Sequence, residues 1–413
     1  MKKIILYGIP NSSESYPIMD FLKRGVVDFD WIDISNEVIR ESNGQVINNP
    51  EKLPVIIFPD DKIIVNPTIE QIAERLGWIT KPKYSEYDLS IYGAGPAGLS
   101  AAVYAASEGL KTIVVEREAI GGQAGTSSMI ENFFGFPNGI SGANLAERAR
   151  QQALKFGVEI LLLKEGVKAI FYDNKISVDF ASGEKMIARS NICATGVEYD
   201  KLNLDEESRF YHKGLYYGAG ASEAFFCQDK DLYIVGGGNS AGQAAIYFSG
   251  FARRVFMVIR KGNLADTLSE YLLKRITAQN NIHILYNSQV TALAGDDYLS
   301  EIQITDSKTN KQQWYPTSKL FVCIGGKPNT DWAAETSICR SKSGYLYTGN
   351  DLLALKQYQQ CWSLDRAPYS LETSVPGCFA AGDVRYNSVK RVASAVGEGA
   401  MAVAQVHQYL ATI

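Results

Sequence analysis

Two glycine-rich turns, each directly after a short apolar run, constrain this sequence most. The first is Gly93-Ala94-Gly95-Pro96-Ala97-Gly98, after Tyr87 to Tyr92, and the second is Gly236-Gly237-Gly238-Asn239-Ser240-Ala241, after Leu232 to Val235. In such a strand-turn-helix unit, the first glycine permits a tight turn and the second lets the backbone approach a pyrophosphate. The third lets helix and strand pack closely. Two such turns predict an α/β protein with two Rossmann-like dinucleotide-binding domains.

An acidic residue completes the first unit. The strand predicted from Thr112 to Val115 ends in Glu116, 23 residues after Gly93, where a carboxylate can accept hydrogen bonds from an adenosine ribose. Strand, turn, helix, second strand and acid together predict a dinucleotide site. Its candidate residues are Gly93, Gly95, Pro96, Ala97, Gly98 and Glu116.

The second unit differs at the position of that acid. The residue 23 places after Gly236 is Ile259, and the cations Arg260 and Lys261 follow it. Cations there suit the 2′-phosphate of NADPH better than the free ribose of NADH. The candidate NADPH-binding residues are Gly236, Gly238, Asn239, Ser240, Ala241, Arg260 and Lys261.

The C-terminal part of the chain identifies the first dinucleotide as FAD by resemblance. A buried strand is predicted over 377–381, it leads into Gly382-Asp383, and a helix is predicted over 389–406. In two-dinucleotide flavoproteins, which this pattern resembles, the aspartate lies against the ribityl chain of the flavin. The N-terminus of the helix supports the carbonyl side of the flavin ring. The FAD candidates added here are Gly382, Asp383, Arg391, Val392 and Ala393.

Further motifs resemble the low-molecular-weight thioredoxin reductases. Gly121-Gly122-Gln123 and the segment 130–137 resemble the flavin-contacting segment of that family, which implies that Gly122, Gln123 and Asn132 contact FAD. Ala194-Thr195-Gly196 resembles the exit from the first half of the flavin domain, and 324–330 resembles the return to it. The resemblance covers 87–413. It implies an FAD-binding domain over 87–201 and 325–413, an NAD(P)H-binding domain over 202–324, and a homodimer.

The sequence departs from that family where the redox-active Cys-x-x-Cys pair belongs. Alignment back from Gly236 places Ala219 and Ser222 at the two cysteine positions and Glu223 at the acid that follows them. Cys227 is the nearest thiol, at the predicted start of the next strand, and it has no resolving partner. We therefore expect no disulfide reduction by this segment. The catalytic residues remain unassigned.

The first 80 residues predict a separate domain. Strands near 3–8, 28–33, 55–58 and 63–65 and helices near 15–25 and 68–76 give a β-α-β-β-β-α order that resembles glutaredoxins. Pro54 stands at the place of that family's cis-proline, but Ser12 and Ser15 stand where its cysteines belong, so thiol chemistry is not expected. The domain is either a docking or dimer-contact module or a structural remnant in which Ser12 caps the helix. Residues 80–86 are the expected linker.

Composition and net charge limit which partners and which cellular compartment are expected for this chain. The formal net charge is −4, which gives no electrostatic footprint for nucleic acid. No apolar run is long enough for a signal peptide or a membrane span, so a cytoplasmic protein is expected. The six cysteines form no Cys-x-x-Cys pair and the three histidines lie far apart, so no metal site is expected.

Two functions follow as hypotheses. The first is an FAD-dependent NADPH oxidoreductase that passes electrons to an acceptor outside the chain, such as ferredoxin or flavodoxin, a quinone, dioxygen or a disulfide of a partner. The resemblance to ferredoxin-NADP reductases of the thioredoxin-reductase type, which also lack the cysteine pair, favours a protein acceptor. The second is a flavin-binding redox sensor or scaffold that acts through the cysteine-less glutaredoxin-like domain.

Overall fold

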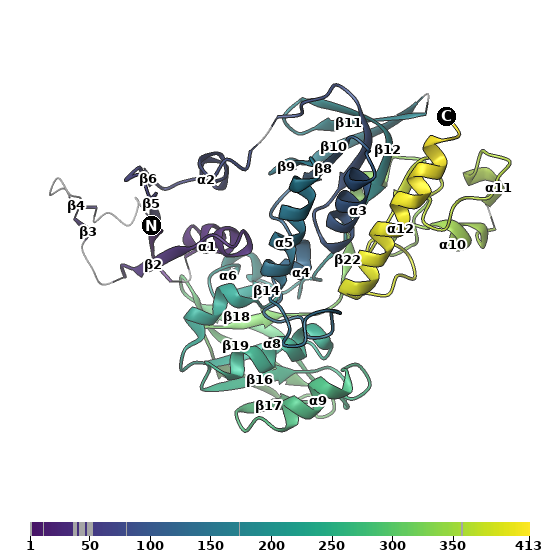
Figure 1. Ribbon diagram of the computed structural model, residues 1–413. Coiled ribbons are helices and arrows are strands. Elements are labelled where there is room, and N and C mark those ends of the chain that lie inside the picture. The colour runs from purple at the N-terminus through teal and green to yellow at the C-terminus, as the bar shows by residue number, and fades with distance from the viewer. Residues whose placement is uncertain are drawn as a thin grey trace. The chain divides into compact units, whose positions relative to one another are not determined.

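The computed structural model (Figure 1) describes residues 2–10, 12–35, 39–40, 46–47, 53–79, 81–172, 174–356 and 358–413. Asn11, in the predicted glutaredoxin-like loop, and Thr80, at the start of the predicted linker, lie outside the described residues. The chain forms two compact units. The first comprises 1–72, 126–129 and 199–325, and the second comprises 73–125, 130–198 and 326–413.

The N-terminal part of the first unit is a four-stranded sheet in the order β2-β1-β5-β6. Strand β1 runs parallel to β2 and antiparallel to β5, and the Leu53–Pro54 peptide bond is cis. The predicted order of these elements is confirmed, and the short pair β3-β4 is additional. The bounds are β1 Ile4–Gly8, α1 Ser15–Arg24, β2 Phe29–Asp33, β3 Ile39–Arg40, β4 Val46–Ile47, β5 Val55–Ile57, β6 Ile63–Val65 and α2 Ile69–Arg75.

Hydroxyl groups accept hydrogen bonds from backbone amides at the starts of both N-terminal helices. Thr68 Oγ1 accepts a hydrogen bond from the Gln71 amide, and the Gln71 side chain accepts one from the Thr68 amide, which is a capping box. The Ser12 hydroxyl accepts a hydrogen bond from the Ser15 amide at 3.0 Å. The serine that replaces a cysteine in the glutaredoxin comparison therefore binds the first amide of α1, although the residue that directly precedes the helix is Glu14.

The rest of the first unit contains a five-stranded parallel sheet, in the order β14-β21-β15-β16-β17, and a three-stranded antiparallel sheet, β18-β19-β20. Cys227 lies in a 3-10 helix before β15, not at the start of that strand as predicted. The bounds are α6 Glu207–Phe210, β14 Leu215–Tyr217, α7 Ala221–Ala224, η2 Phe225–Cys227, β15 Asp231–Val235, α8 Asn239–Ser249, β16 Arg254–Val258, α9 Glu270–Thr277, β17 Ile282–Leu285, β18 Ser288–Gly295, β19 Leu299–Asp306, β20 Gln312–Pro316 and β21 Leu320–Val322.

The second unit is built on a seven-stranded sheet in which β12 pairs with β11, β7 and β23. Strands β7, β8, β9, β12 and β23 are parallel, and β10, β11 and β12 are antiparallel. The bounds are β7 Tyr87–Tyr92, α3 Pro96–Ser107, β8 Thr112–Glu116, α4 Gly122–Gly125, α5 Gly142–Lys155, β9 Glu159–Leu162, β10 Gly166–Tyr172, β11 Lys175–Phe180, β12 Lys185–Cys193, β13 Val197–Glu198, β22 Lys327–Pro328, η3 Asp331–Ala333, α10 Gly349–Leu353, α11 Tyr358–Cys361, β23 Cys378–Ala380 and α12 Val392–Leu410.

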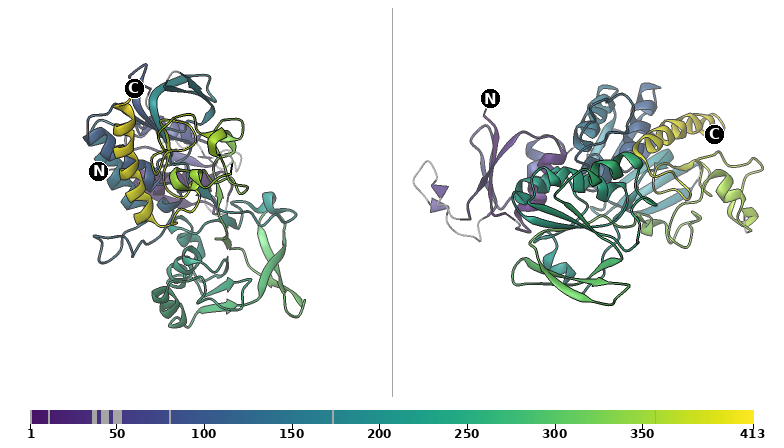
Figure 2. Two further views of the ribbon diagram at one scale, coloured as in Figure 1. Left: turned by 90° about the vertical axis from the view of Figure 1, so that its right-hand side faces the viewer. Right: turned by 90° about the horizontal axis from the view of Figure 1, so that it is seen from below.

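Small residues let α12 pack closely on α3, and the two helices run side by side (Figure 2). A Cβ added at Gly399 would lie 2.2 Å from the Ala97 carbonyl oxygen, so only glycine fits there. The helix predicted over 389–406 begins three residues later, because Arg391 is extended and forms the N-cap. None of the described helices is both long and apolar enough to cross a membrane.

Candidate functional site

The first glycine-rich turn lies between β7 and α3 and has no room for side chains. Gly93 has a φ of +102°, and an added Cβ would lie 2.4 Å from the Ala194 carbonyl oxygen. An added Cβ at Gly98 would lie 1.9 Å from the Gly93 carbonyl oxygen. Helix α3 begins with Pro96 after Gly95, and no side chain caps it. Its first amides are therefore suited to a phosphate, as in dinucleotide-binding turns.

Glu116 lies next to this turn. It ends β8 and is buried, and its carboxylate accepts hydrogen bonds from the amides of Ala94 and Glu118, both at 2.8 Å. Gly122 begins α4, which also contains Gln123, and a Cβ added at Gly122 would lie 3.2 Å from the Gly95 Cα. The structure thus brings Glu116, Gly95 and Gly122 together, although they are distant in sequence.

The C-terminal candidates meet the same turn. A Cβ added at Gly382 would lie 3.0 Å from the Ala97 Cβ, so the Gly382-Asp383 loop touches the start of α3. The Gly382 amide donates to Glu398 of α12 at 2.7 Å, and Arg385 forms an ion pair with the same carboxylate. Burial raises the pKa of Asp383, while the cationic Lys390 and Arg391 oppose the shift.

The remaining FAD candidates take two positions. Arg391 is the N-cap of α12, and Val392 and Ala393 form its first turn. Asn132 lies on an exposed turn, and its side chain makes no hydrogen bond to any residue that the structure describes. Gly382 is therefore hydrogen bonded to α12 and packs against the start of α3, whereas no hydrogen bond between described residues holds the Asn132 side chain.

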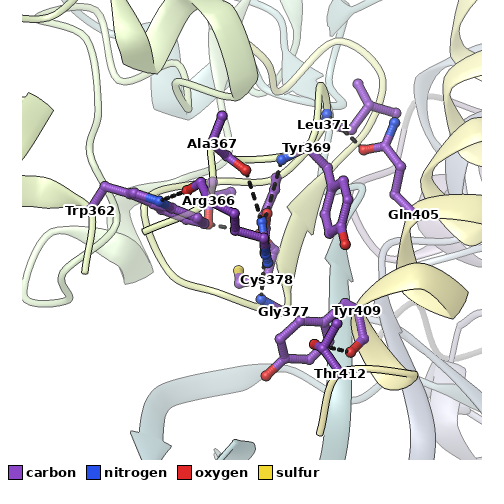
Figure 3. Close-up of polar contacts among 12 residues, drawn as sticks. Trp362, Arg366, Ala367, Tyr369, Leu371, Gly377, Cys378, Gln405, Tyr409 and Thr412 are labelled. Carbon is purple, nitrogen blue, oxygen red and sulfur yellow. Dashed lines mark hydrogen bonds and ion pairs between the residues drawn. The ribbon is translucent and has the colours of Figure 1, made fainter. Parts of the chain in front are cut away.

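An ion pair between a partly exposed arginine and a buried glutamate stabilises the loop before β23 (Figure 3). The Arg366 guanidinium donates to both oxygens of Glu372, at 2.6 and 2.9 Å, and stacks on the Tyr369 ring. The Glu372 side chain is fully buried and also accepts from the Gly377 amide at 3.0 Å. Gln405 of α12 accepts from the Leu371 amide. These contacts fix the strand that delivers Gly382 and Asp383.

The second glycine-rich turn lies between β15 and α8. Gly236 has a φ of +140°, and an added Cβ would lie 2.5 Å from the Cys323 carbonyl oxygen. Gly238 is the N-cap of α8, with Asn239, Ser240 and Ala241 in its first turn. Asn239 accepts a hydrogen bond from the Ser269 amide at 2.9 Å and donates one to the Ser269 hydroxyl. This turn is therefore tied to the N-terminus of α9.

Ile259 occupies the position of the missing acid, and it is buried directly after β16. A Cβ added at Gly237 would lie 3.2 Å from its side chain, so it is adjacent to the glycine-rich turn. Arg260 and Lys261 follow it and are exposed, and neither makes an ion pair within the described part of the chain. Two exposed cations thus directly follow a residue that touches the turn, and cations are the residues that bind a 2′-phosphate.

Of the two expected cysteine positions, Ala219 lies in the turn after Gly218, and Ser222 lies in a short helix, α7. The amide of Gly220 donates to Glu223 Oε2 at 2.9 Å, and the Ser222 hydroxyl donates to Asp20 of α1 at 3.0 Å. A small polar hollow, partly open to solvent, lies alongside. Its lining residues are Thr126, Ser127, Ser128, Tyr199, Ala219, Ser240, Gln243 and Ala244.

Comparisons with known proteins place this arrangement in a family. Residues 87–399 match the signature of the pyridine nucleotide-disulphide oxidoreductases. The chain belongs to that family. Thioredoxin reductase 1 of Saccharomyces cerevisiae is 33% identical over 339 residues, which cover 79% of this chain and 98% of the yeast protein. A 34.2 kDa protein in the rubredoxin operon of Clostridium pasteurianum is 32% identical over 327 residues, covering 79% of this chain and 97% of that protein.

Solved structures agree with this pyridine nucleotide-disulphide oxidoreductase assignment. Thioredoxin reductase of T. acidophilum has a TM-score of 0.70 at 26% identity, covering 80% of this chain and 99% of that chain. Thioredoxin reductase of Lactococcus lactis has a TM-score of 0.69 at 25% identity, covering 79% and 100%. The chain is thus a thioredoxin reductase-like, NAD(P)H-dependent flavin oxidoreductase, and members of this group use FAD and NADPH. The bare glycine turns and uncapped helix starts described above fit both dinucleotides.

Several residues of this oxidoreductase were not found from the sequence. They are Tyr16, Asp20 and Lys23 of α1, which contact α7, and Arg366 and Glu398, which brace the loops around β23. No motif marks them. Tyr16, Asp20 and Lys23 contact residues that lie 207, 202 and 199 positions away, and Arg366 and Glu398 contact residues 6 and 16 positions away that no sequence pattern pairs with them.

Proposed function

We propose that this chain oxidises NADPH through bound FAD and passes the electrons to an acceptor outside the chain, without a dithiol at positions 219 and 222. FAD, when bound, supplies the chemistry, because it accepts a hydride and releases electrons singly or in pairs. The protein positions the two nucleotides and tunes the flavin.

Each candidate residue has a role in this proposal. The amides that follow Gly95 would bind the pyrophosphate of FAD, and Glu116 would hold its ribose. The partly buried Asp383 carboxylate would orient the ribityl chain, and the start of α12 would support the flavin ring. Arg260 and Lys261 would bind the 2′-phosphate of NADPH, with the turn 236–241 on its pyrophosphate.

The observation that carries the proposal is the chemistry of α7 and the turn before it. Ala219 offers only a methyl group, and the Ser222 hydroxyl is engaged with Asp20. A serine hydroxyl cannot exchange with a disulfide. Electrons would therefore leave the flavin directly for the acceptor.

The acceptor we favour is a small redox protein. The relative encoded in a rubredoxin operon supports this choice. Rubredoxin, ferredoxin and flavodoxin are the members of this class to test, and a quinone, dioxygen and the disulfide of a partner are the other acceptors.

Anaerobic stopped-flow absorbance tests the proposal. We expect NADPH to bleach the flavin band faster than NADH, and subsequent mixing with rubredoxin, ferredoxin, flavodoxin or a quinone to restore it. Arg260→Ala together with Lys261→Ala should raise the NADPH concentration needed for half-maximal bleaching by about tenfold or more. Lys274→Ala is the control, since Lys274 is an exposed cation paired with Glu270 in the same unit. No bleaching by either nucleotide would refute the proposal.

A second candidate function is a flavin-dependent sensor or scaffold. It is favoured by the contact of Tyr16 and Asp20 with α7, because this contact links residues 1–72 to the segment that carries the disulfide in related reductases. We propose it as the alternative if turnover is absent. Pull-downs with the full chain, oxidised and reduced, should then recover a partner in only one state, and equal recovery in both would exclude the sensor.

A further inference from the structure

One face of α1 docks on the segment Ala219–Cys227. Tyr16, Asp20 and Lys23 follow each other by four and three residues, so they share a face of the helix. The Tyr16 hydroxyl hydrogen bonds to Glu223. The Ser222 hydroxyl donates to Asp20 at 3.0 Å, and Lys23 donates to the Ser222 carbonyl at 3.1 Å.

Aromatic packing extends the contact around these polar bonds. The Tyr16 ring lies 4.5 Å from the His212 ring and 5.1 Å from the Tyr216 ring, measured between centroids. Trp31 of β2 meets Phe226 edge to face at 5.7 Å. Glu223 is only 4% exposed. The interface is therefore packed like a protein core and is not a loose surface contact.

The two contacting residues, Tyr16 and Glu223, occupy corresponding positions in their segments. Tyr16 directly follows Ser15, and Glu223 directly follows Ser222. Ser15 and Ser222 are the positions to which the resemblances to glutaredoxins and thioredoxin reductases assign a second cysteine. The contact thus joins the two segments in which the resemblances would place reactive cysteines. Hydrogen bonds connect these segments instead.

We propose that residues 1–72 form a built-in cover that closes over Ala219–Cys227, and that ionisation of Glu223 loosens it. The closed state places a carboxyl group in a nearly dry interface beside the Asp20 carboxylate. A neutral Glu223 keeps both of its hydrogen bonds there, whereas an ionised one adds a buried negative charge beside the Asp20 carboxylate, which is 22% exposed and lies 3.7 Å from the Arg24 guanidinium. Opening would return it to water.

Among the titratable groups of this interface, Glu223 has the pKa closest to neutral pH. Burial, with the Asp20 carboxylate, raises the pKa of Glu223 to about 7, against the hydrogen bonds from Tyr16 and Gly220. Burial lowers the pKa of His212 to about 4 and that of Lys319 to about 8. The other titratable or charged groups around Glu223 are Tyr16, Asp20, Lys23 and Arg24 on α1, Tyr199, Tyr216 on β14, Cys227, Tyr247 on α8 and Cys323.

The direction of the pH effect follows. The closed state raises the pKa of Glu223 above the ordinary 4.5, so it binds the proton more tightly than the open state. The closing equilibrium is most favourable below pH 4.5. It weakens by up to about tenfold for each pH unit until about pH 7, and is level above that.

Hydrogen exchange of the full chain, measured by mass spectrometry on peptides spanning 215–228, tests the cover. After correction for intrinsic exchange rates, we expect protection to fall about tenfold or more between pH 5 and pH 8. Glu223→Gln, which cannot ionise, should keep its protection at pH 8, and Tyr16→Phe should lose protection at pH 5. Equal pH dependence in the wild type and Glu223→Gln would overturn the proposal.

Glu207→Gln is the matched control. Glu207 is also buried and also accepts a hydrogen bond from a tyrosine, Tyr217, but both residues belong to 199–325. This variant should leave the pH dependence of 215–228 unchanged. A loss of the pH dependence in Glu207→Gln would attribute it to general loosening of the unit and would contradict the cover.

A cross-link separates closing from local unfolding. Asp20→Cys with Ser222→Cys should form a disulfide under diamide, and the oxidised protein should be as protected at pH 8 as the wild type at pH 5. Glu70→Cys with Ser222→Cys is the control, since Glu70 is exposed on α2, and it should not cross-link. Absence of the Asp20-Ser222 cross-link would overturn the proposal. These measurements need no turnover, so they stand apart from the acceptor assays.

Discussion

Gly93 shows how one residue can decide whether a nucleotide is held. We expect Gly93→Ala to lose FAD and to destabilise its unit, because an added Cβ would meet the Ala194 carbonyl oxygen at 2.4 Å in a backbone with φ of +102°. The backbone strain alone is about 1–3 kcal/mol. The FAD content per chain and the thermal unfolding temperature measure the two effects.

Gly109→Ala is its matched control. Gly109 also has a positive φ, +90°, but an added Cβ would meet nothing within 4 Å. This variant should carry only the strain, about 1–2 kcal/mol, and should retain FAD. Full FAD retention by Gly93→Ala would show that the turn does not bind the pyrophosphate.

Lys319 gives a pH prediction at the same scale. It is fully buried, donates to the Tyr216 hydroxyl at 3.2 Å, and burial lowers its pKa to about 8. The folded state therefore releases this proton before the unfolded state does. Its contribution to the free energy of unfolding should rise by about 1.4 kcal/mol for each pH unit between 8 and 10.

Urea unfolding at pH 7.5, 9 and 10 measures this effect as the difference between the wild type and Lys319→Met. Lys274→Met, at a lysine that is 74% exposed, should show no such pH-dependent difference. If the difference between the wild type and Lys319→Met does not change from pH 8 to 10, Lys319 is not buried as a titrating group.

The ion pair of Arg366 with Glu372 stabilises a whole element, the strand β23 and the loop before it. We expect Glu372→Gln to destabilise the second unit by about 3 kcal/mol, because it leaves the Arg366 cation half-buried without its counter-charge. Since β23 leads directly to Gly382 and Asp383, FAD content should fall as well. The exposed pair of Glu270 and Lys274 is the comparison, and Glu270→Gln should change stability by less than about 0.5 kcal/mol. If Glu372→Gln and Glu270→Gln changed stability by similar amounts, the stabilising role of the Arg366–Glu372 ion pair would be refuted.

The elements also show what the sequence can predict. Strands β7, β8 and β15 and the turns at Gly93 and Gly236 follow from local patterns, because their apolar runs and glycines encode backbone geometry directly. The start of α12 was predicted three residues early, since the extended Arg391 interrupts an otherwise helical pattern. The contact of Tyr16 with Glu223 spans 207 residues, and no local pattern encodes such a pairing.

At the scale of the whole molecule, the proposed function requires that the thiols of the chain take no part in turnover. All six cysteines are free, with four buried and only Cys339 and Cys361 partly exposed. We expect iodoacetamide under native conditions to alkylate these two and to leave NADPH-dependent acceptor reduction within about twofold of the untreated rate. Yeast thioredoxin reductase, reduced with NADPH before the same treatment, is the positive control and should lose its activity toward thioredoxin.

The two partly exposed thiols lie in contact with each other, and this contact affects how fast they are alkylated. Cys361 hydrogen bonds to Cys339, and burial together with this contact raises the pKa of Cys361 to about 11. Cys361 should therefore react slowly at pH 7, so the alkylation is carried out at pH 9 and the modified cysteines are counted by mass spectrometry. Loss of turnover in proportion to the modified Cys339 and Cys361 would contradict a thiol-independent path. It would place the dithiol chemistry in the loops around α11, far in sequence from Ala219 and Ser222.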